Sequence, residues 1–343
     1  MSTPEAPPRR RRARKKTWSA LGELGRRPND YEIVTHNMNH TTGETPLEMG
    51  PNVHGNVWLK KYRDGMALRV ERWDDFRDPD RVTYDSYVKM QDEAESFVDQ
   101  LLESFTAEEP YDEELSSDCL GLLAHAVTPQ RYLVHAQQMV AAYVQQLAPS
   151  SYVGNCAAFQ AADHLRRVQR IAYRTKQLDS AHPTRGFGST ERSVWEEHPK
   201  WQPTREAMEK LLTTYTWDEA FVASNLIIRP VLDEIFLRQA SLAARAAGDE
   251  LDALVLENLH RDSQRHDRWS KALVDFLVDA HAENRAHVRR FGAAWSPLAE
   301  SIVQSGAALL AEHVPDLSAE AIAHDVRTRI AEQRLSIGLG AEA

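Results

Sequence analysis

Apolar residues recur at steps of three and four along most of the chain from about residue 82 onward, which is the period of an amphipathic helix. The clearest stretch is 155–176, which contains no proline or glycine and is rich in good helix formers. One face of this stretch is apolar and is expected to be buried; it consists of Ala158, Ala162, Leu165, Val168, Ile171 and Ala172. The sequence lacks strand-like alternation at any useful length, so the pattern predicts an all-α fold.

The same period predicts a series of further helices. The first begins after residues 78–80, where Asp78 can cap the helix and Pro79 can take its first position. A long helical pattern over 218–246 contains Pro230, which is expected to kink it. The remaining helices are expected at about residues 129–147, 191–197, 204–214, 250–280, 284–312 and 318–334, the last of them capped by Ser318.

Residues 17–80 lack this period but are rich in large aromatic side chains. We expect an extended, irregular N-terminal arm, which either lies across another subunit or forms a loop-rich cap on its own helices. On the first interpretation, the candidate interface residues are Trp18, Tyr31, Trp58, Tyr62, Trp73 and Phe76. The predicted organisation is a disordered basic tail at 1–16, the arm at 17–80, a helical domain at 81–336 and a C-terminal tail at 337–343.

The 343-residue chain has 41 basic and 51 acidic residues and a formal net charge of -10. Residues 1–16 hold seven basic residues and one acidic residue, so the rest of the chain carries about -16, which disfavours contact with nucleic acid. The basic tail itself could bind nucleic acid or an anionic surface, or it could be a solvated tail or a strap on an acidic partner. No aromatic residues interleave its charges, which favours the second interpretation.

The two cysteines have no paired spacing, which indicates a reducing compartment rather than a disulfide framework. No apolar run is long enough to span a bilayer, and the basic N-terminus lacks the apolar core of a signal peptide. We therefore expect a cytoplasmic protein without membrane contact.

Two segments carry the candidate chemistry. Residues 163–167 read Asp-His-Leu-Arg-Arg, and residues 262–266 read Asp-Ser-Gln-Arg-His. Both look like the Asp-Glu-x-Arg-His segment with which ferritin-like diiron oxygenases hold iron, where a Glu and a His three residues later share one helix face. Here the two ligand positions are occupied by His164 and Arg167 in the first copy, and by Ser263 and His266 in the second. An arginine has no lone pair to donate to a metal.

The other two helices of such a site also lack carboxylates. Residues 131–148 contain no Asp or Glu, and Asn225 stands near the position of the next ligand. Two imidazoles without carboxylates are a poor ligand set for a pair of hard iron ions, so the five positions are interpreted as a vestigial metal frame. No catalytic, cofactor-binding or intact metal-binding residue is expected in this chain. Glu257 and His260 form a literal Glu-x-x-His, but they are turned by about 120° from that face and are interpreted as a chance match.

Several stretches together resemble the β, or small hydroxylase, subunit of the soluble diiron multicomponent monooxygenases. The resemblance is strongest to the branch that oxidises toluene, phenol, alkenes and isoprene, and it runs from about residue 16 to about residue 334. It is carried by residues 76–80 (Phe-Arg-Asp-Pro-Asp), 155–156, 162–166, 172–175, 186–188 (Gly-Phe-Gly), 194–196 (Val-Trp-Glu) and 261–270.

This resemblance implies a ferritin-like bundle that shares the fold of a catalytic α subunit but lacks its ligands. It also implies an (αβγ)2 hydroxylase with the diiron centre in α, served by an effector protein, a Rieske 2Fe–2S ferredoxin and an NADH-dependent FAD reductase. The expected role is a non-catalytic scaffold in the oxidation of an alkene or an aromatic hydrocarbon, with isoprene or another small alkene preferred. Two alternatives remain: a self-sufficient ferritin-like diiron oxidase with atypical ligands, and a basic-armed helical protein that binds nucleic acid.

Overall fold

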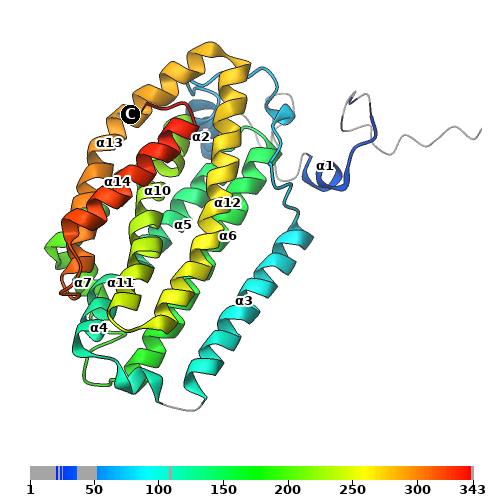
Figure 1. Cartoon of the computed structure of the whole chain (residues 1–343). Coiled ribbons are helices and arrows are strands. Elements are labelled where there is room, and N and C mark those ends of the chain that lie inside the picture. The colour runs from blue at the N-terminus through cyan, green and yellow to red at the C-terminus, as the bar shows by residue number, and fades with distance from the viewer. Residues whose placement is uncertain (1–20, 22–23, 25, 37–51, 108–109, 341–343) are drawn as a thin grey trace, which may run out of the picture.

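The structure, a computed structural model, describes residue 21, residue 24 and residues 26–36, 52–107 and 110–340. Every regular element in these ranges is a helix, which confirms the predicted all-α helical bundle. Figure 1 shows the long helices α6 (Ser151–Ala181) and α12 (Glu250–Ala280) running beside each other through the molecule, with α3 (Tyr84–Thr106) at its edge. None of the described helices is long and apolar enough to cross a membrane.

Four helical columns form the centre of the bundle. The helix α5 (Gln130–Gln146) packs along α6, while α12 packs against α6 and against the segmented column that runs from α9 (Trp217–Phe221) to α11 (Ala240–Ala246). The surrounding elements are α1 (Asp30–Thr35), α2 (His54–Tyr62), η2 (Trp73–Asp75), η3 (Tyr111–Glu114), α4 (Ser117–Leu122), η4 (Leu123–Val127), α7 (Glu191–Glu197), η5 (Pro199–Trp201), α8 (Gln202–Leu212), α13 (Ala282–Ala311) and α14 (Ala319–Ser336). The expected helices at 191–197, 250–280 and 318–334 therefore form close to their predicted bounds.

Local sequence explains where these helices begin and end. Gly248 adopts a φ of 88° after α11, a conformation that glycine tolerates without a Cβ clash. The next residue, Asp249, accepts a hydrogen bond from the Asp252 amide at 3.0 Å and so caps α12. Ser318 caps α14 in the same way, through the Ala321 amide at 3.2 Å, as predicted.

The column that contains Pro230 departs from α-helical geometry on both sides of the proline. It consists of α9, a π-helical segment η6 (Val222–Ile228), α10 (Arg229–Asp233), a second π-helical segment η7 (Glu234–Gln239) and α11. A proline removes one backbone donor and crowds the preceding turn, which favours a local departure from α-helical geometry. Such a departure is not obligatory, because α13 continues through Pro297. Where a kink was predicted at Pro230, the structure has two π-helical segments that flank α10.

The predicted start of the first long helix was wrong. The helix begins at Tyr84, with Thr83 rather than Asp78 as its N-cap, and Thr83 and Ser86 form a capping box. Asp78 is buried and closes the preceding turn, because its carboxylate accepts hydrogen bonds from the amides of Asp80 and Val82, both at 3.0 Å. An Asp-Pro pair can form a turn as well as begin a helix, and residues 78–82 form a turn.

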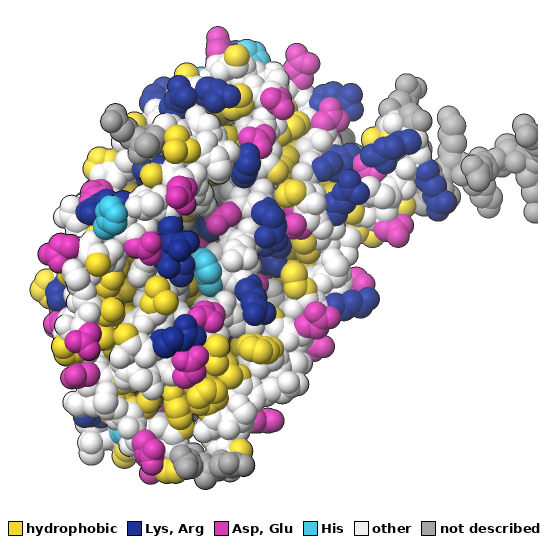
Figure 2. Space-filling model, viewed as in Figure 1, with side chains coloured by type: hydrophobic (Ala, Val, Ile, Leu, Met, Phe, Trp, Pro, Cys, Tyr) yellow, Lys and Arg dark blue, Asp and Glu magenta, His cyan; other side chains and the backbone are white. Residues whose placement is uncertain are grey.

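The apolar face predicted to be buried on 155–176 is mostly on the outside. Of the six predicted residues, Leu165 is 47% exposed and Ala172 is exposed, Ala158, Ala162 and Val168 are half-buried, and Ile171 is buried at 5%. The opposite face of α6 buries Asp163, His164 and Arg167. We call the outward residues the outer stripe of α6; they are Ala158, Ala161, Ala162, Leu165, Val168, Ala172 and Tyr173, each of them partly or well exposed. The side of the bundle seen in Figure 2 shows interspersed basic and acidic side chains. The outer stripe is apolar, and two exposed polar residues, Gln169 and Lys176, lie on the same face of α6. The apolar period predicted the helix correctly, but the prediction that its apolar face is buried was wrong for most of these residues.

The described parts of the arm pack on the chain's own bundle. Tyr31 is 4% and Phe76 is 1% exposed, and both belong to the main hydrophobic core. At the other end, Ile337 and Leu339 are also buried in that core, so this part of the predicted C-terminal tail is integrated in the fold. The predicted basic tail at 1–16 and Trp18 lie outside the described residues.

Candidate functional site

All five positions of the expected metal frame lie in the interior. His164 and Arg167 come from α6, Asn225 from η6, and Ser263 and His266 from α12, and each is at most 4% exposed. The ring centroids of His164 and His266 are 5.4 Å apart. The structure thus brings the two imidazoles together, as the motif spacing predicts, and surrounds them with ion pairs and amides.

Asp163, one residue before His164, connects three helices. One carboxylate oxygen accepts hydrogen bonds from the Tyr87 hydroxyl at 2.9 Å and the Gln91 amide at 3.0 Å. The other accepts from His266 Nε2 at 2.7 Å and pairs with the Arg265 guanidinium. Burial raises the pKa of Asp163 to about 6, against the opposing effect of Arg265, so the carboxylate is ionised at neutral pH. The Asp163 carboxylate therefore accepts hydrogen bonds from four side chains.

A second ion-pair group joins α3 to α12 through Arg166. Its guanidinium donates to Glu95 at 2.6 Å, to Asp262 at 2.8 Å and to the Asn258 side-chain oxygen at 2.6 Å. All three acceptors lie around a side chain that is only 7% exposed. Arg166 therefore holds the edge helix α3 against the bundle, where only Val98 and Leu102 of α3 are buried.

At the centre of the frame, Arg167 and Arg229 share Asp233. Arg167 lies 3.3 Å from Asp233 and donates to the Gln130 side chain at 2.7 Å, and Arg229 donates to Asp233 at 2.9 Å and to Asp267 at 2.5 Å. Burial lowers the pKa of Arg167 to about 10, against the effect of Asp233, so it remains a cation at neutral pH. Two guanidinium cations thus stand between two carboxylates, at a place where an iron protein would have metal charge and its carboxylate ligands.

Both the nitrogen and the oxygen of the Asn225 side chain form hydrogen bonds. Asn225 donates to Gln160 at 2.9 Å and to Ser270 at 3.1 Å, and its oxygen accepts from Ser224 at 2.8 Å. The Trp269 indole donates to the same Gln160 oxygen at 3.2 Å. These neutral hydrogen bonds connect α6, η6 and α12 in one layer.

Farther along α6, Arg174 anchors the helix to two other elements. Its guanidinium bridges Asp112 of η3, at 3.0 Å, and Asp252 of α12, at 2.8 Å. These two aspartates raise the pKa of Arg174, and Arg174 in turn lowers the pKa of Asp252 against the effect of burial. The pair stabilises the fold in its charged form.

Both histidines of the frame are held neutral. Burial lowers the pKa of His164 and of His266 well below 6.5, and neighbouring cations, Arg167 and Arg229 for His164 and Arg229 and Arg265 for His266, act in the same direction. Because their folded-state pKa is depressed, they favour folding above the unfolded value of about 6.5. This contribution decreases as the pH falls below that value, by about 1.4 kcal/mol per pH unit for each ring.

We therefore expect the ring resonances of His164 and His266 to remain those of neutral imidazoles from pH 8 to pH 5. NMR of histidine-labelled protein would measure this, with His→Gln variants for assignment. A ring that titrates near pH 6.5 would contradict the buried arrangement.

The residues present do not fit a diiron centre. Arg167 cannot be a ligand, Asn225 and Ser263 are neutral, and Asp163 is taken up by its ion pair. In the described parts of the chain, no group of three His, Cys, Asp or Glu side chains is placed to hold a metal ion. The literal motif at Glu257 and His260 is no exception, because Glu257 pairs with Arg245 at 2.8 Å on the surface.

Sequence reasoning missed several members of this centre. Asp163 was visible in the motif but had no assigned role, and Arg229 and Asp233 were not singled out. The available signal was an Arg and an Asp four residues apart in an otherwise apolar run, a spacing that places both on one helix face. Gln137 of α5 was missed as well; like Gln130, it is a buried polar residue of the helix that lacks carboxylates.

The candidate interface aromatics of the arm contact their own chain. Trp58 lies 4.5 Å from Tyr62 and 5.1 Å from Tyr215 between ring centroids, and Trp73 lies 5.6 Å from Trp217. Together with the buried Tyr31 and Phe76, they favour the loop-rich cap over an arm that leaves the subunit. Tyr31 and Phe76 are buried within this chain, and the six aromatic residues stay a prediction as interface candidates.

Comparison with known proteins gives the family. The family described as Methane/Phenol/Alkene Hydroxylase matches residues 58–281. The chain is 37% identical over 301 residues to the β subunit of the hydroxylase component of the toluene-4-monooxygenase system of Ectopseudomonas mendocina, covering 87% of this chain and 91% of that protein. It is 26% identical to the small hydroxylase subunit of the propane 2-monooxygenase of Gordonia sp. strain TY-5, covering 70% of this chain and 68% of that one.

Solved structures agree. The fold matches a chain in the structure of toluene 4-monooxygenase with toluene bound in its resting active site, with a TM-score of 0.81 and 36% identity, covering 90% of this chain and 100% of that chain. The bundle, the ion-paired frame and these similarities point to the same conclusion. The chain belongs to the methane/phenol/alkene hydroxylase family and is a β, or small hydroxylase, subunit of the soluble diiron monooxygenase type.

Proposed function

We propose that this β subunit is non-catalytic and that the diiron centre of its hydroxylase lies in a partner α subunit. The observation that carries the proposal is the arginine-filled frame, in which Arg167 and Arg229 pair with Asp233 inside the four central columns. A buried cation at a ligand position opposes metal binding by charge repulsion and supplies no lone pair. We accordingly interpret His164, Arg167, Asn225, Ser263 and His266 as a vestigial frame.

The subunit's contribution would be structural, and the outer stripe of α6 is the surface that we assign to the α subunit. Apolar residues at this period would normally face the core, yet here the polar face of α6 is buried and the apolar face is outside. Uncharged apolar surface of this kind is typical of obligate interfaces, which resemble a domain core divided between two chains. On the neighbouring α5, Met139 is 40% exposed and extends the apolar character.

We further propose the assembly implied by the sequence resemblance: an (αβγ)2 hydroxylase with an effector protein, a Rieske ferredoxin and an NADH-dependent reductase as transient partners, located in the cytoplasm. The hydroxylase would insert one oxygen atom of O2 into a small hydrocarbon. Relatives named for toluene and propane support the hydrocarbon class. Isoprene or another small alkene remains our first candidate, and product analysis with isoprene, toluene and phenol in competition would test that choice.

The test of the non-catalytic role is iron analysis of the assembled hydroxylase. The double variant His164→Gln/His266→Gln removes both remaining imidazoles of the frame. We expect iron per assembly and turnover per assembly to remain at the wild-type level, because neither ring holds metal. His324→Gln, at an exposed position on α14, is the matched control. Loss of iron in the double variant but not in the control, or stoichiometric iron in the chain purified alone, would overturn the proposal.

A further inference from the structure

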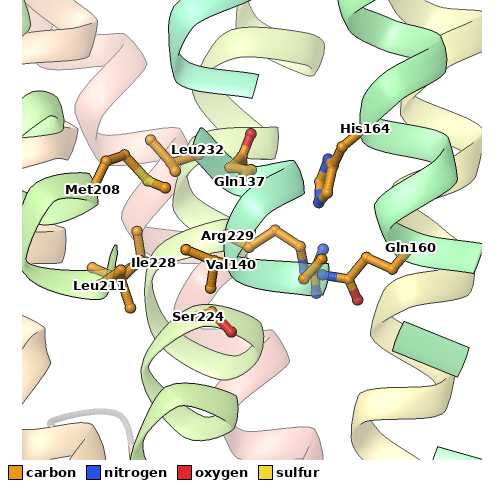
Figure 3. A pocket seen from close by; sticks show the side chains of 11 residues that line it. Gln137, Val140, Gln160, His164, Met208, Leu211, Ser224, Ile228, Arg229 and Leu232 are labelled. Carbon is orange, nitrogen blue, oxygen red and sulfur yellow. The ribbon is translucent and has the colours of Figure 1, made fainter. Parts of the chain in front are cut away.

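A small pocket lies beside the frame, between α5, α6 and the segmented column (Figure 3). Gln137 reaches it from α5, His164 and Gln160 from α6, and Ser224 and Arg229 from the segmented column. Figure 3 shows His164 and Arg229 pointing into the space next to Gln137. The free space at its centre is about the size of one water molecule.

Buried polar atoms at this pocket lack partners within the described chain. Gln137 is 5% exposed, and neither its amide nitrogen nor its amide oxygen has a hydrogen-bond partner. Arg229 is 3% exposed, and its Nε also has no partner, although both of its terminal nitrogens donate hydrogen bonds, to Asp233, Asp267 and the Asn225 carbonyl. Buried polar groups are nearly always hydrogen-bonded, so a donor and an acceptor left together in one pocket indicate a bound molecule.

The chemistry of these groups selects the ligand. The Gln137 amide needs both an acceptor and a donor, and Arg229 Nε needs an acceptor, which a single water molecule can provide. A hydrocarbon would leave all three atoms unsatisfied. An anion has no donor for the Gln137 oxygen, and the charge of Arg229 is already balanced by Asp233 and Asp267. A metal cation would meet one guanidinium, two amides, one hydroxyl and a single imidazole, with no carboxylate among the lining residues, which is a poor ligand set.

We propose that this pocket is a specific binding site for one ordered water molecule, held by Gln137 and Arg229 beside the His164 ring. The water joins α5, the column without a charged residue in the frame, to α6 and the segmented column. Hydrogen bonds through the water then connect three of the four central columns, a task that metal ions perform in an iron-binding bundle. This inference concerns the interior of the chain alone and does not rest on the proposed function.

A high-resolution crystal structure of the assembled hydroxylase, from crystals with and without a bromide soak, tests the site. We expect a single peak within hydrogen-bond distance of the Gln137 amide and Arg229 Nε, with no anomalous signal after the soak. A bromide signal at that position would identify an anion site and overturn the proposal. A continuous elongated density would identify an organic ligand and overturn it as well.

The sign of a stability change provides a second test. In Gln137→Leu the water loses its main partner, so we expect the peak to vanish and the melting temperature of the hydroxylase to fall by a few degrees. If the pocket were dry, the same variant would remove two unsatisfied atoms and raise the melting temperature, which would overturn the proposal. Gln138→Leu, at the partly exposed neighbouring position, is the matched control and should change the melting temperature little.

Discussion

Replacement of Arg174 by methionine is expected to destabilise the protein by about 3–5 kcal/mol at neutral pH. The methionine retains most of the apolar stem but leaves Asp112 and Asp252 buried without their counter-ion. An unpaired buried carboxylate is far more costly than the pair itself is favourable, because the desolvation penalty remains while the attraction is lost. The loss should appear as a fall in melting temperature of roughly 4–7 °C for a chain of this length.

The pH dependence of this loss is part of the same prediction. Arg174 lowers the pKa of Asp252, so the pair contributes stability above the unfolded value of about 3.8, and this contribution is lost as the pH falls through the lower folded value. The difference in unfolding free energy between wild type and Arg174→Met should therefore be large at pH 7 and become smaller toward pH 4. Thermal unfolding at several pH values measures it. Arg192→Met, which removes an exposed pair with Glu196, is the control and should cost less than about 1 kcal/mol. Equal melting temperatures for wild type and Arg174→Met would contradict the assignment of Arg174 as an anchor.

Replacement of Leu165 by glutamate is expected to abolish assembly with the α subunit while leaving the fold of this chain intact. Leu165 is 47% exposed in the isolated subunit, so a charge there remains solvated and folding should change by less than about 0.5 kcal/mol. In an apolar interface the same carboxylate would be desolvated without a partner, which costs several kcal/mol and weakens association by at least about 100-fold.

Co-purification of the subunits and size-exclusion chromatography measure this effect, and circular dichroism checks the fold. Leu335→Glu places the same charge on α14, where Leu335 is 60% exposed, and serves as the matched control. We expect the control to assemble normally. Normal assembly of Leu165→Glu at wild-type concentrations would show that the outer stripe of α6 is not the contact surface.

The sequence by itself determined the helices, the frame and the family. Helix α12 forms over 250–280 as predicted because a strong apolar period runs along it and a glycine and an aspartate cap stand at its start. The replacement of ligands by Arg167, Asn225 and Ser263 is a matter of residue identity, so it could be read without coordinates. The similarity to a toluene monooxygenase β subunit was likewise carried by linear motifs.

Only the tertiary structure decided which face of α6 is inside and what fills the frame. The apolar period identifies one face of a helix, but it does not say whether that face lies against the chain's own core or outside it. The inward face of α6 can be polar because its charged residues form ion pairs with residues far away in the sequence. Asp163 pairs with Arg265, Arg167 with Asp233 and Arg174 with Asp252. A buried charge is tolerated only when its partner is within contact distance, and that distance exists only once the helices have packed.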